Sequence, residues 1–186
     1  LSITAAAGWP LPEEPRRRMV QALASVIDGR LRSEDYGDVR LQKLAAFTAL
    51  ARAGAATPAM LGQLGLAPAE MPTASLADYI AAADQLQATT QRAAAEAELR
   101  RRLVYEGTRL DLSDASNTPW WLMQSADEAA IKAATVAVGR PGWQDEAPRL
   151  TIGVATRQAR GHWDTTVANA WGALLVRRFA AAYPAQ

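Results

Sequence analysis

The sequence contains no cysteine, and this absence removes several kinds of chemistry at once. Without cysteine the chain cannot form a disulfide, a zinc–thiolate site or a cysteine nucleophile from its own residues. Long apolar runs are absent as well, since no stretch approaches the ~18–20 residues that span a bilayer. We therefore expect no direct insertion of this chain into a membrane.

A large excess of charge of one sign is also missing. The 186 residues carry a formal net charge of +1, and the arginines are scattered among acidic residues. The short run Arg100–Arg102 lies among glutamates, so a solvated face is favoured over a phosphate-binding patch. We expect no nucleic-acid partner.

What the sequence has in abundance is alanine, with a small aromatic share of 6%. This balance favours helices, because alanine loses no side-chain entropy when it becomes helical. The length fits one helical domain spanning residues 1–186. The chain begins at Leu1 without a signal-type segment, and we expect it to be a fragment of a domain in a larger protein.

Apolar stripes bounded by capping residues predict a series of helices. Asp38, Thr57 and Ser75 are expected at helix starts, and Ser125 with Glu128 has the spacing of a capping box. A short strand is expected where leucines alternate with charged residues at 109–112. The helices are expected at residues 13–28, 39–53, 58–65, from Ser75 onward, 90–106 and 126–138.

Residues 148–179 predict a helix, a tight turn and a second helix. Gly161 is expected as the C-cap of the first helix, with Trp163 wedged under the corner. Thr165 or Thr166 is expected to cap the second helix. The predicted fold is therefore all-α, with antiparallel helical hairpins forming part of an α/α toroid. Because the ring is expected to be incomplete, an exposed apolar flank could mediate self-association.

Several motifs occur in a fixed order along the chain. The later ones are W-W-L-M at 120–123, S-x-D at 125–127, P-x-W, P-R-L, R-Q-x-x-G-x-W-x-T-T at 157–166 and A-N-x-W at 168–171. Earlier ones are L-Q-K-L-A-A-F-T-A-L-A-R-A-G at 41–54 and T-A-S-L-A-D-Y at 73–79. Together they resemble the helical thioester-type domain of bacterial α2-macroglobulins, and the resemblance covers most of the chain.

This resemblance implies a structural and interaction domain of a large periplasmic or cell-surface protein that traps proteases. In thioester-bearing relatives, a Cys-x-Glu-Gln motif forms the reactive acyl group. No such bond can form here, because the chain has no cysteine. Either the motif lies outside this chain, or the protein resembles those relatives that trap by conformational enclosure alone. The proteases would be partners of the full-length protein.

Two groups of residues have both a chemical and a structural interpretation. His162 is the one histidine and could act as a general base, but no nucleophile is identifiable beside it. An exposed turn histidine is favoured. Trp120 and Trp121 could stack on sugars or peptides, whereas packing in the core or at a corner is favoured.

Acidic residues permit a second hypothesis, a glycan-processing α/α-toroid enzyme with a pair of carboxylates. The candidates are Asp111, Asp114, Asp127 and Asp164. Asp127 is also favoured by the dipole of its own helix. Polar packing is expected of Asn169, which would bond to a neighbouring helix end or loop, and of Arg157 and Gln158 around Trp163. We predict no catalytic, cofactor-binding or metal-binding residue. A passive helical scaffold is the third hypothesis.

Overall fold

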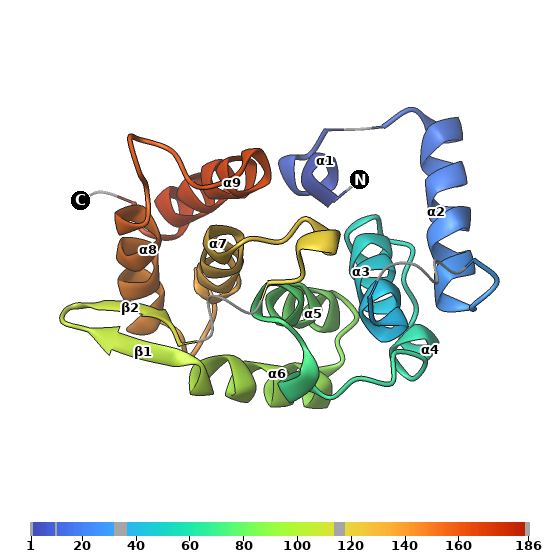
Figure 1. Cartoon of the computed structure of the whole chain (residues 1–186), viewed down its shortest axis with the longest axis horizontal. Coiled ribbons are helices and arrows are strands. Elements are labelled where there is room, and N and C mark those ends of the chain that lie inside the picture. Colours follow the sequence, from blue (N-terminus) through green and yellow to red (C-terminus); the bar gives the residue numbers. More distant parts are fainter. Residues whose placement is uncertain (1, 10, 32–36, 114–117, 185–186) are drawn as a thin grey trace. The chain divides into compact units, whose positions relative to one another are not determined.

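The computed structural model describes residues 2–9, 11–31, 37–113 and 118–184, and its fold is all-α (Figure 1). The described elements are helices and one antiparallel hairpin of two strands. The contacts of the chain group into two compact units, residues 1–71 with 78–95 and residues 72–77 with 96–186. That residues 1–186 form a single domain stays a prediction.

The elements follow one another in a simple order. The first unit holds α1 (Ser2–Ala7), α2 (Glu13–Ile27), α3 (Val39–Arg52), α4 (Pro58–Leu61) and the 3-10 helix η1 (Pro68–Glu70). Two helices, α5 (Thr73–Gln85) and α6 (Thr89–Arg101), contribute residues to both units. The second unit continues with β1 (Leu103–Glu106), β2 (Arg109–Leu112), η2 (Trp120–Leu122), α7 (Ala126–Ala137), α8 (Glu146–Thr156) and α9 (Thr166–Ala182).

The core of the first unit is built around α3. Asp38 begins this helix as expected, because its side chain accepts a hydrogen bond from the Arg40 N–H. Phe47 is fully buried, and its ring centroid lies 6.4 Å from that of Tyr79. Buried apolar side chains on α3 and in the later part of α5 stabilise this unit by their removal from water.

Helix α2 buries less than its sequence predicts. An apolar stripe of a helix usually faces the core, but Ile27 is the buried residue of this helix. Met19 is 42% exposed, and Val20, Leu23 and Val26 are half-buried. The helix forms as its apolar periodicity predicts, but other elements of the first unit bury only part of its apolar stripe.

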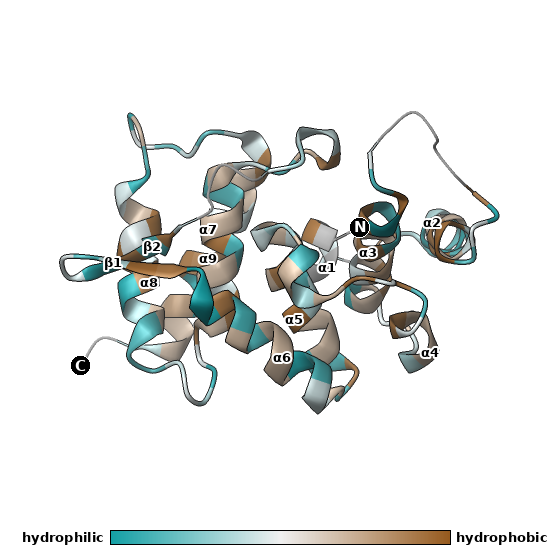
Figure 2. Ribbon diagram, turned by 60° about the horizontal axis from the view of Figure 1, so that its bottom comes forward, coloured by the Kyte–Doolittle hydropathy of each residue, from teal (hydrophilic) through white to brown (hydrophobic). Residues whose placement is uncertain are grey.

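Helix α7 lies at the centre of the second unit, and both α8 and α9 pack against it. Ten of its twelve residues are buried, so other elements cover this helix on more than one side. Figure 2 shows apolar colours along most of this helix. Helices α8 and α9 were expected to form a hairpin with each other, but their main packing partner is α7.

Several element boundaries differ from the prediction. The charged helix expected at 90–106 ends at Arg101, and residues 103–106 form β1 instead. Val104 and Tyr105 have strand-forming side chains, and Gly107 makes the following turn with φ of +64°. The strand expected around Leu110 and Leu112 is confirmed as β2. Helix α4 ends at Leu61 rather than Gly65, and α5 begins at Thr73 rather than Ser75.

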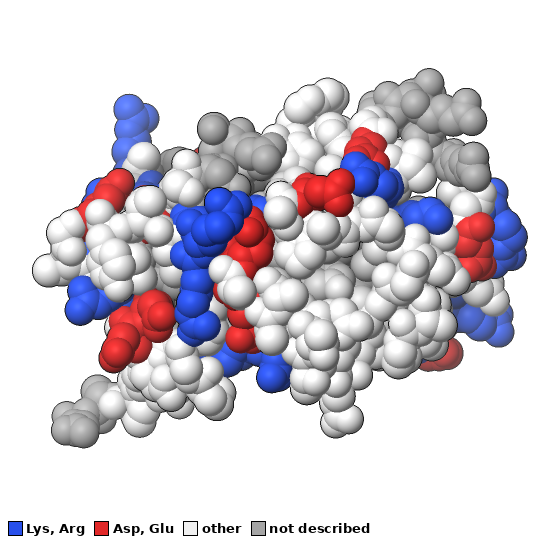
Figure 3. Space-filling view, turned by 90° about the horizontal axis from the view of Figure 1, so that it is seen from below, with Lys and Arg blue, Asp and Glu red and all other residues white. Residues whose placement is uncertain are grey.

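The surface charges and the helix lengths can be compared with two features of the sequence, its scattered charges and its lack of long apolar runs. On the face shown in Figure 3, positive and negative side chains lie next to one another rather than in one large area of a single sign. Among the helices of the described part of the chain, none combines the length and apolar character needed to cross a membrane.

Candidate functional site

Trp163 fills the corner between α8 and α9. Its side chain is 8% exposed, and its indole Nε1 donates a hydrogen bond of 2.9 Å to the carbonyl of Val154 on α8. The N–H group of a buried tryptophan usually finds such an acceptor. The wedge that the G-x-W-x-T-T motif predicts is therefore confirmed.

The first turn of α9 closes around this tryptophan. Asn169 Oδ1 accepts the backbone N–H of Trp163 at 3.2 Å, while Asn169 Nδ2 donates to the Trp163 carbonyl at 3.0 Å and to the Thr165 carbonyl at 2.7 Å. The Thr165 hydroxyl caps the helix by accepting the N–H of Ala168. Asn169 thus binds the turn before its own helix, which confirms the structural role expected for it.

Gly172 lets α9 approach the ring of Trp163 closely. A Cβ atom at this position would lie 2.2 Å from the Trp163 Cζ3 atom, far inside van der Waals contact. Gly153 plays the same part on α8, where a Cβ would lie 2.1 Å from the carbonyl oxygen of Leu110 in β2. Neither role could be predicted from the sequence, because a helical glycine carries no local sign of what it will contact.

Gly161 is not the C-cap of α8. The helix ends at Thr156, and Arg157 follows it in a right-handed conformation. Arg160 and Gly161 both have positive φ, 57° and 82°, and Ala159 and His162 exchange backbone hydrogen bonds across them. These are the features of a type I′ turn, which permits a tight reversal where glycine occupies a left-handed position. Gly161 therefore belongs to this turn, five residues beyond the end of α8.

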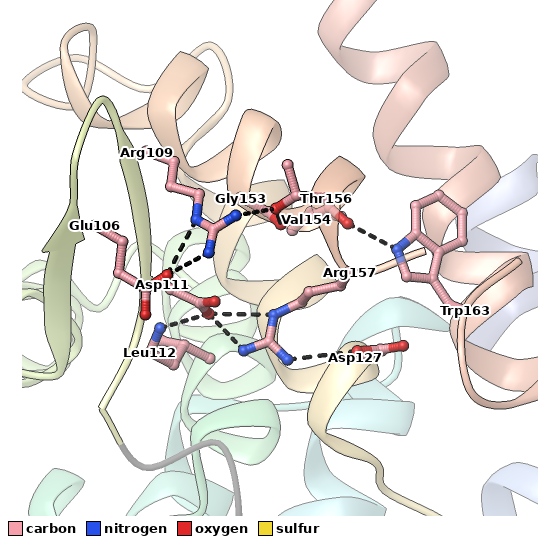
Figure 4. A network of polar contacts seen from close by, with 10 residues as sticks. All are labelled: Glu106, Arg109, Asp111, Leu112, Asp127, Gly153, Val154, Thr156, Arg157 and Trp163. Atoms are coloured by element: carbon pink, nitrogen blue, oxygen red, sulfur yellow. Dashed lines mark hydrogen bonds and ion pairs between the residues drawn. The ribbon is translucent and has the colours of Figure 1, made fainter. Parts of the chain in front are cut away.

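Arg157 lies where four elements meet and joins two carboxylates (Figure 4). Its Nε atom donates to Asp111 Oδ1 on β2 at 3.1 Å, and its Nη1 atom donates to Asp127 Oδ1 on α7 at 3.4 Å. Asp127 Oδ2 accepts the backbone N–H of Asp164, just before α9, at 2.9 Å. We call Asp111, Asp127, Arg157 and Asp164 the Arg157 clasp.

Further hydrogen bonds hold the acids of the clasp in place. Asp111 Oδ1 also accepts the N–H of Leu112 at 2.7 Å, and Asp164 Oδ1 accepts the hydroxyl of Ser125 at 2.8 Å. The same hydroxyl of Ser125 caps α7 by accepting the N–H of Glu128, as the capping box predicts. Arg157 was expected to pack around Trp163, but its polar partners are these two carboxylates. Gln158 is exposed.

The structure therefore brings together three of the four acids considered for glycosidase chemistry. Asp114 lies outside the described residues. Asp111 and Asp127 both contact Arg157, with side chains that are 15% and 12% exposed. This arrangement is suited to cross-linking elements.

His162 and the two tryptophans of η2 lie apart from any such cluster. His162 is exposed, as expected of a turn histidine, and its Nδ1 lies 2.9 Å from the Trp163 carbonyl. Trp121 is half-buried. Trp120 is 77% exposed, so the packing expected for it is wrong within this chain. The 3-10 helix η2 that carries both tryptophans has three residues, and Met123 ends it in a left-handed conformation with φ of 56°.

The arginines of the run 100–102 have three different environments. Arg102 is 5% exposed, and it donates to Glu98 at 2.7 Å and to the Thr73 hydroxyl at 2.9 Å. Arg101 also binds Glu98, while the guanidinium of Arg100 lies 4.0 Å from the ring centroid of Trp143. The expected solvated face is confirmed for Arg100 and Arg101, which are exposed, and is wrong for Arg102. The Glu98–Arg102 ion pair is indicated by the sequence, because a glutamate four residues before an arginine in a helix lies next to it.

No metal centre is evident in the parts of the chain that the structure covers, since they contain no cluster of three suitable ligand residues. Compared with models of protein families, with curated proteins and with solved structures, the chain matches none of them. The geometry is therefore the main guide to what the second unit does.

Proposed function

We propose that this chain is a non-catalytic helical part of a bacterial α2-macroglobulin-like protease trap that acts in the periplasm or at the cell surface. The observation that carries the proposal is the corner around Trp163. Four residues of the motifs that carry the resemblance form this corner. Gly161 lies in the turn, Trp163 fills the corner, Thr165 caps α9, and Asn169 bonds to the backbone of Trp163.

A non-catalytic role is supported by how the polar residues of the second unit are used. The acids of the Arg157 clasp accept hydrogen bonds from Arg157 and from backbone N–H groups. Such groups connect β2, α7, α8 and the start of α9 rather than presenting a reactive atom. The proposed place of this unit is within an incomplete α/α toroid, in which α7 would be one of the inner helices.

The proposal is tested with the full-length protein and a panel of proteases. Enclosure of a protease would leave its active site open to small peptides but closed to large proteins. We expect cleavage of the full-length protein to change its size or compactness and to reduce hydrolysis of protein substrates while peptide hydrolysis continues. If neither size nor either hydrolysis rate changes, the trap is rejected and the passive scaffold remains.

Two neighbouring substitutions separate a structural role from a chemical one. Trp163→Ala removes the wedge and should abolish trapping, because the corner between α8 and α9 loses its packing. His162→Ala removes an exposed side chain from the same turn and should leave trapping unchanged. Loss of trapping in the His162→Ala protein, with normal folding by circular dichroism, would contradict the non-catalytic role.

Self-association through an apolar flank belongs to the same proposal. The stripe on α2 supports it, because Met19 is exposed and Leu23 is half-buried in a helix with one buried residue. Sedimentation velocity over a range of concentrations should show a dimer that Leu23→Glu removes. A monomer at every concentration would contradict this part of the proposal.

A further inference from the structure

The β1–β2 hairpin has one edge that is open to another strand. Ser113 donates a hydrogen bond of 2.9 Å to the carbonyl of Arg102, which marks these residues as a hydrogen-bonded pair at the start of the ladder. In an antiparallel ladder, such pairs alternate with pairs that share no hydrogen bonds. Leu103 and Tyr105, opposite Leu112 and Leu110, therefore direct their backbone N–H and C=O groups away from β2.

The two edges of this hairpin have different surroundings. The edge of β2 is covered, because the Leu110 carbonyl lies against Gly153 of α8 so closely that a Cβ on the glycine would be 2.1 Å away. The edge of β1 lies on the outer side of the hairpin (Figure 1). Among the described residues, no hydrogen bond to the outward backbone groups of Leu103 or Tyr105 is formed.

Strand β1 has only some of the devices that protect an edge. Proteins protect exposed edges with very short strands, charged side chains such as lysine, proline or a bulge. β1 is short and ends in Glu106, but it contains no lysine or proline, and its register with β2 is regular over all four pairs. Val104 is 37% exposed and Tyr105 is 69% exposed. The outward backbone groups of Leu103 and Tyr105 can form hydrogen bonds with one more strand, and the exposed side chains of Val104 and Tyr105 can contact its side chains.

The charge beside this edge indicates what that strand should carry. The guanidinium of Arg149 lies 6.0 Å from the ring centroid of Tyr105, and its hydrogen bond goes to the carbonyl of Thr108 at 3.4 Å. Within the described ranges it forms no ion pair. A residue paired with Tyr105 has its side chain on the same face of the sheet. An acidic side chain at that position would therefore lie close to Arg149.

We propose that the edge of β1 binds an extended peptide segment of a partner protein as a third strand. The segment places a β-branched residue opposite Val104 and an acidic residue opposite Tyr105, next to Arg149. Backbone hydrogen bonds to Leu103 and Tyr105 supply the attachment, and the ion pair supplies the preference for an acidic side chain. This inference does not depend on the trap proposal.

Amide hydrogen exchange of the whole chain, followed by NMR, tests the proposal. The probe is the acetylated and amidated peptide Thr-Val-Glu-Val-Thr, which presents valine on both sides of its glutamate in either strand direction. Saturation with this peptide should slow exchange at the amides of Leu103 and Tyr105. Exchange at Val104 and Glu106 should change little, because their N–H groups already bond to β2.

Two controls distinguish strand addition from non-specific binding of the peptide. The same peptide N-methylated at its glutamate cannot donate the required hydrogen bond and should not bind. A peptide with lysine in place of glutamate should bind about two- to fivefold more weakly, the range of an exposed ion pair. The Arg149→Glu protein should reverse this preference between the two peptides.

Three results would overturn the inference. One is the absence of a saturable change at Leu103 and Tyr105 up to millimolar peptide. A second is binding of the N-methylated peptide with unchanged affinity. The third is slow exchange at these two amides in the protein alone that strengthens with protein concentration, because the edge would then be occupied by a second copy of the chain.

Discussion

A single methyl group on α9 should destabilise the second unit. Gly172→Ala places a Cβ 2.2 Å from one ring atom of Trp163 and 2.6 Å from two others. The ring has little freedom to move away, since it is 8% exposed and its N–H is bonded to Val154. Overpacking of this kind costs about 1–3 kcal/mol, and the fixed ring favours the upper end of that range.

Helix propensity acts in the opposite direction. Replacing a mid-helix glycine by alanine stabilises a helix by about 1 kcal/mol. The net expectation for Gly172→Ala is therefore a loss of about 2 kcal/mol in the free energy of unfolding. This corresponds to a fall in Tm of about 4–8 °C for a chain of this size. Urea and thermal unfolding, followed by circular dichroism, measure both quantities.

The control on the same helix is Ala173→Gly, at an exposed position. It should lose about 1 kcal/mol through propensity alone. In a Trp163→Leu background, where the ring is gone, Gly172→Ala should become neutral or stabilising. A coupling energy of about 2–3 kcal/mol between the two sites is expected. If Gly172→Ala stabilises the protein that retains Trp163, the close approach described for this corner is wrong.

Three further predictions concern the polar contacts. Arg157→Met leaves two largely buried carboxylates without their cation and should lower the free energy of unfolding by about 3 kcal/mol, measured in urea; unchanged stability would refute the clasp. Thr165→Ala removes the N-cap of α9 and should cost about 1 kcal/mol in the same assay, and a change near zero would contradict its capping role. Hydrogen bonds from Arg101 and then from Arg102 lower the pKa of Glu98 to about 2. Its contribution to stability is therefore complete above the ordinary carboxyl pKa of 4.5 and is lost as the pH falls toward 2. The Tm of Glu98→Gln protein should lie below that of the unchanged protein at pH 7 and approach it in acid, and a constant gap would contradict this linkage.

Local signals predicted the helices well where the deciding interactions are local. The caps at Asp38, Ser125 and Thr165 form as expected, because each hydroxyl or carboxylate reaches an N–H group two or three residues along the chain. The burial of α7 was also predictable, because a helix with apolar residues on nearly all sides must be covered by other elements.

The sequence was less informative where a distant partner decides the outcome. Residues 103–106 are an exception, because their partner β2 follows after a two-residue turn and Val104 and Tyr105 themselves favour a strand, yet the preceding charged helix was extended over them. The clasp could not be predicted, since Arg157 and Asp111 are separated by 46 residues and nothing local links them. The exposed position of Trp120 was missed for a related reason, because size and apolar character favour burial without specifying it.

The connectivity of the two units has a consequence for dissecting the protein. The second unit takes residues 72–77 from the start of α5, although the rest of its chain begins only at residue 96. A shortened protein that starts at residue 96 would keep the nearly buried Arg102 but lose Thr73, whose hydroxyl accepts its hydrogen bond. One cut anywhere in the chain therefore cannot release the second unit intact. To isolate it, an experimenter must supply residues 72–77 as a separate peptide or join them to the segment by a new linker.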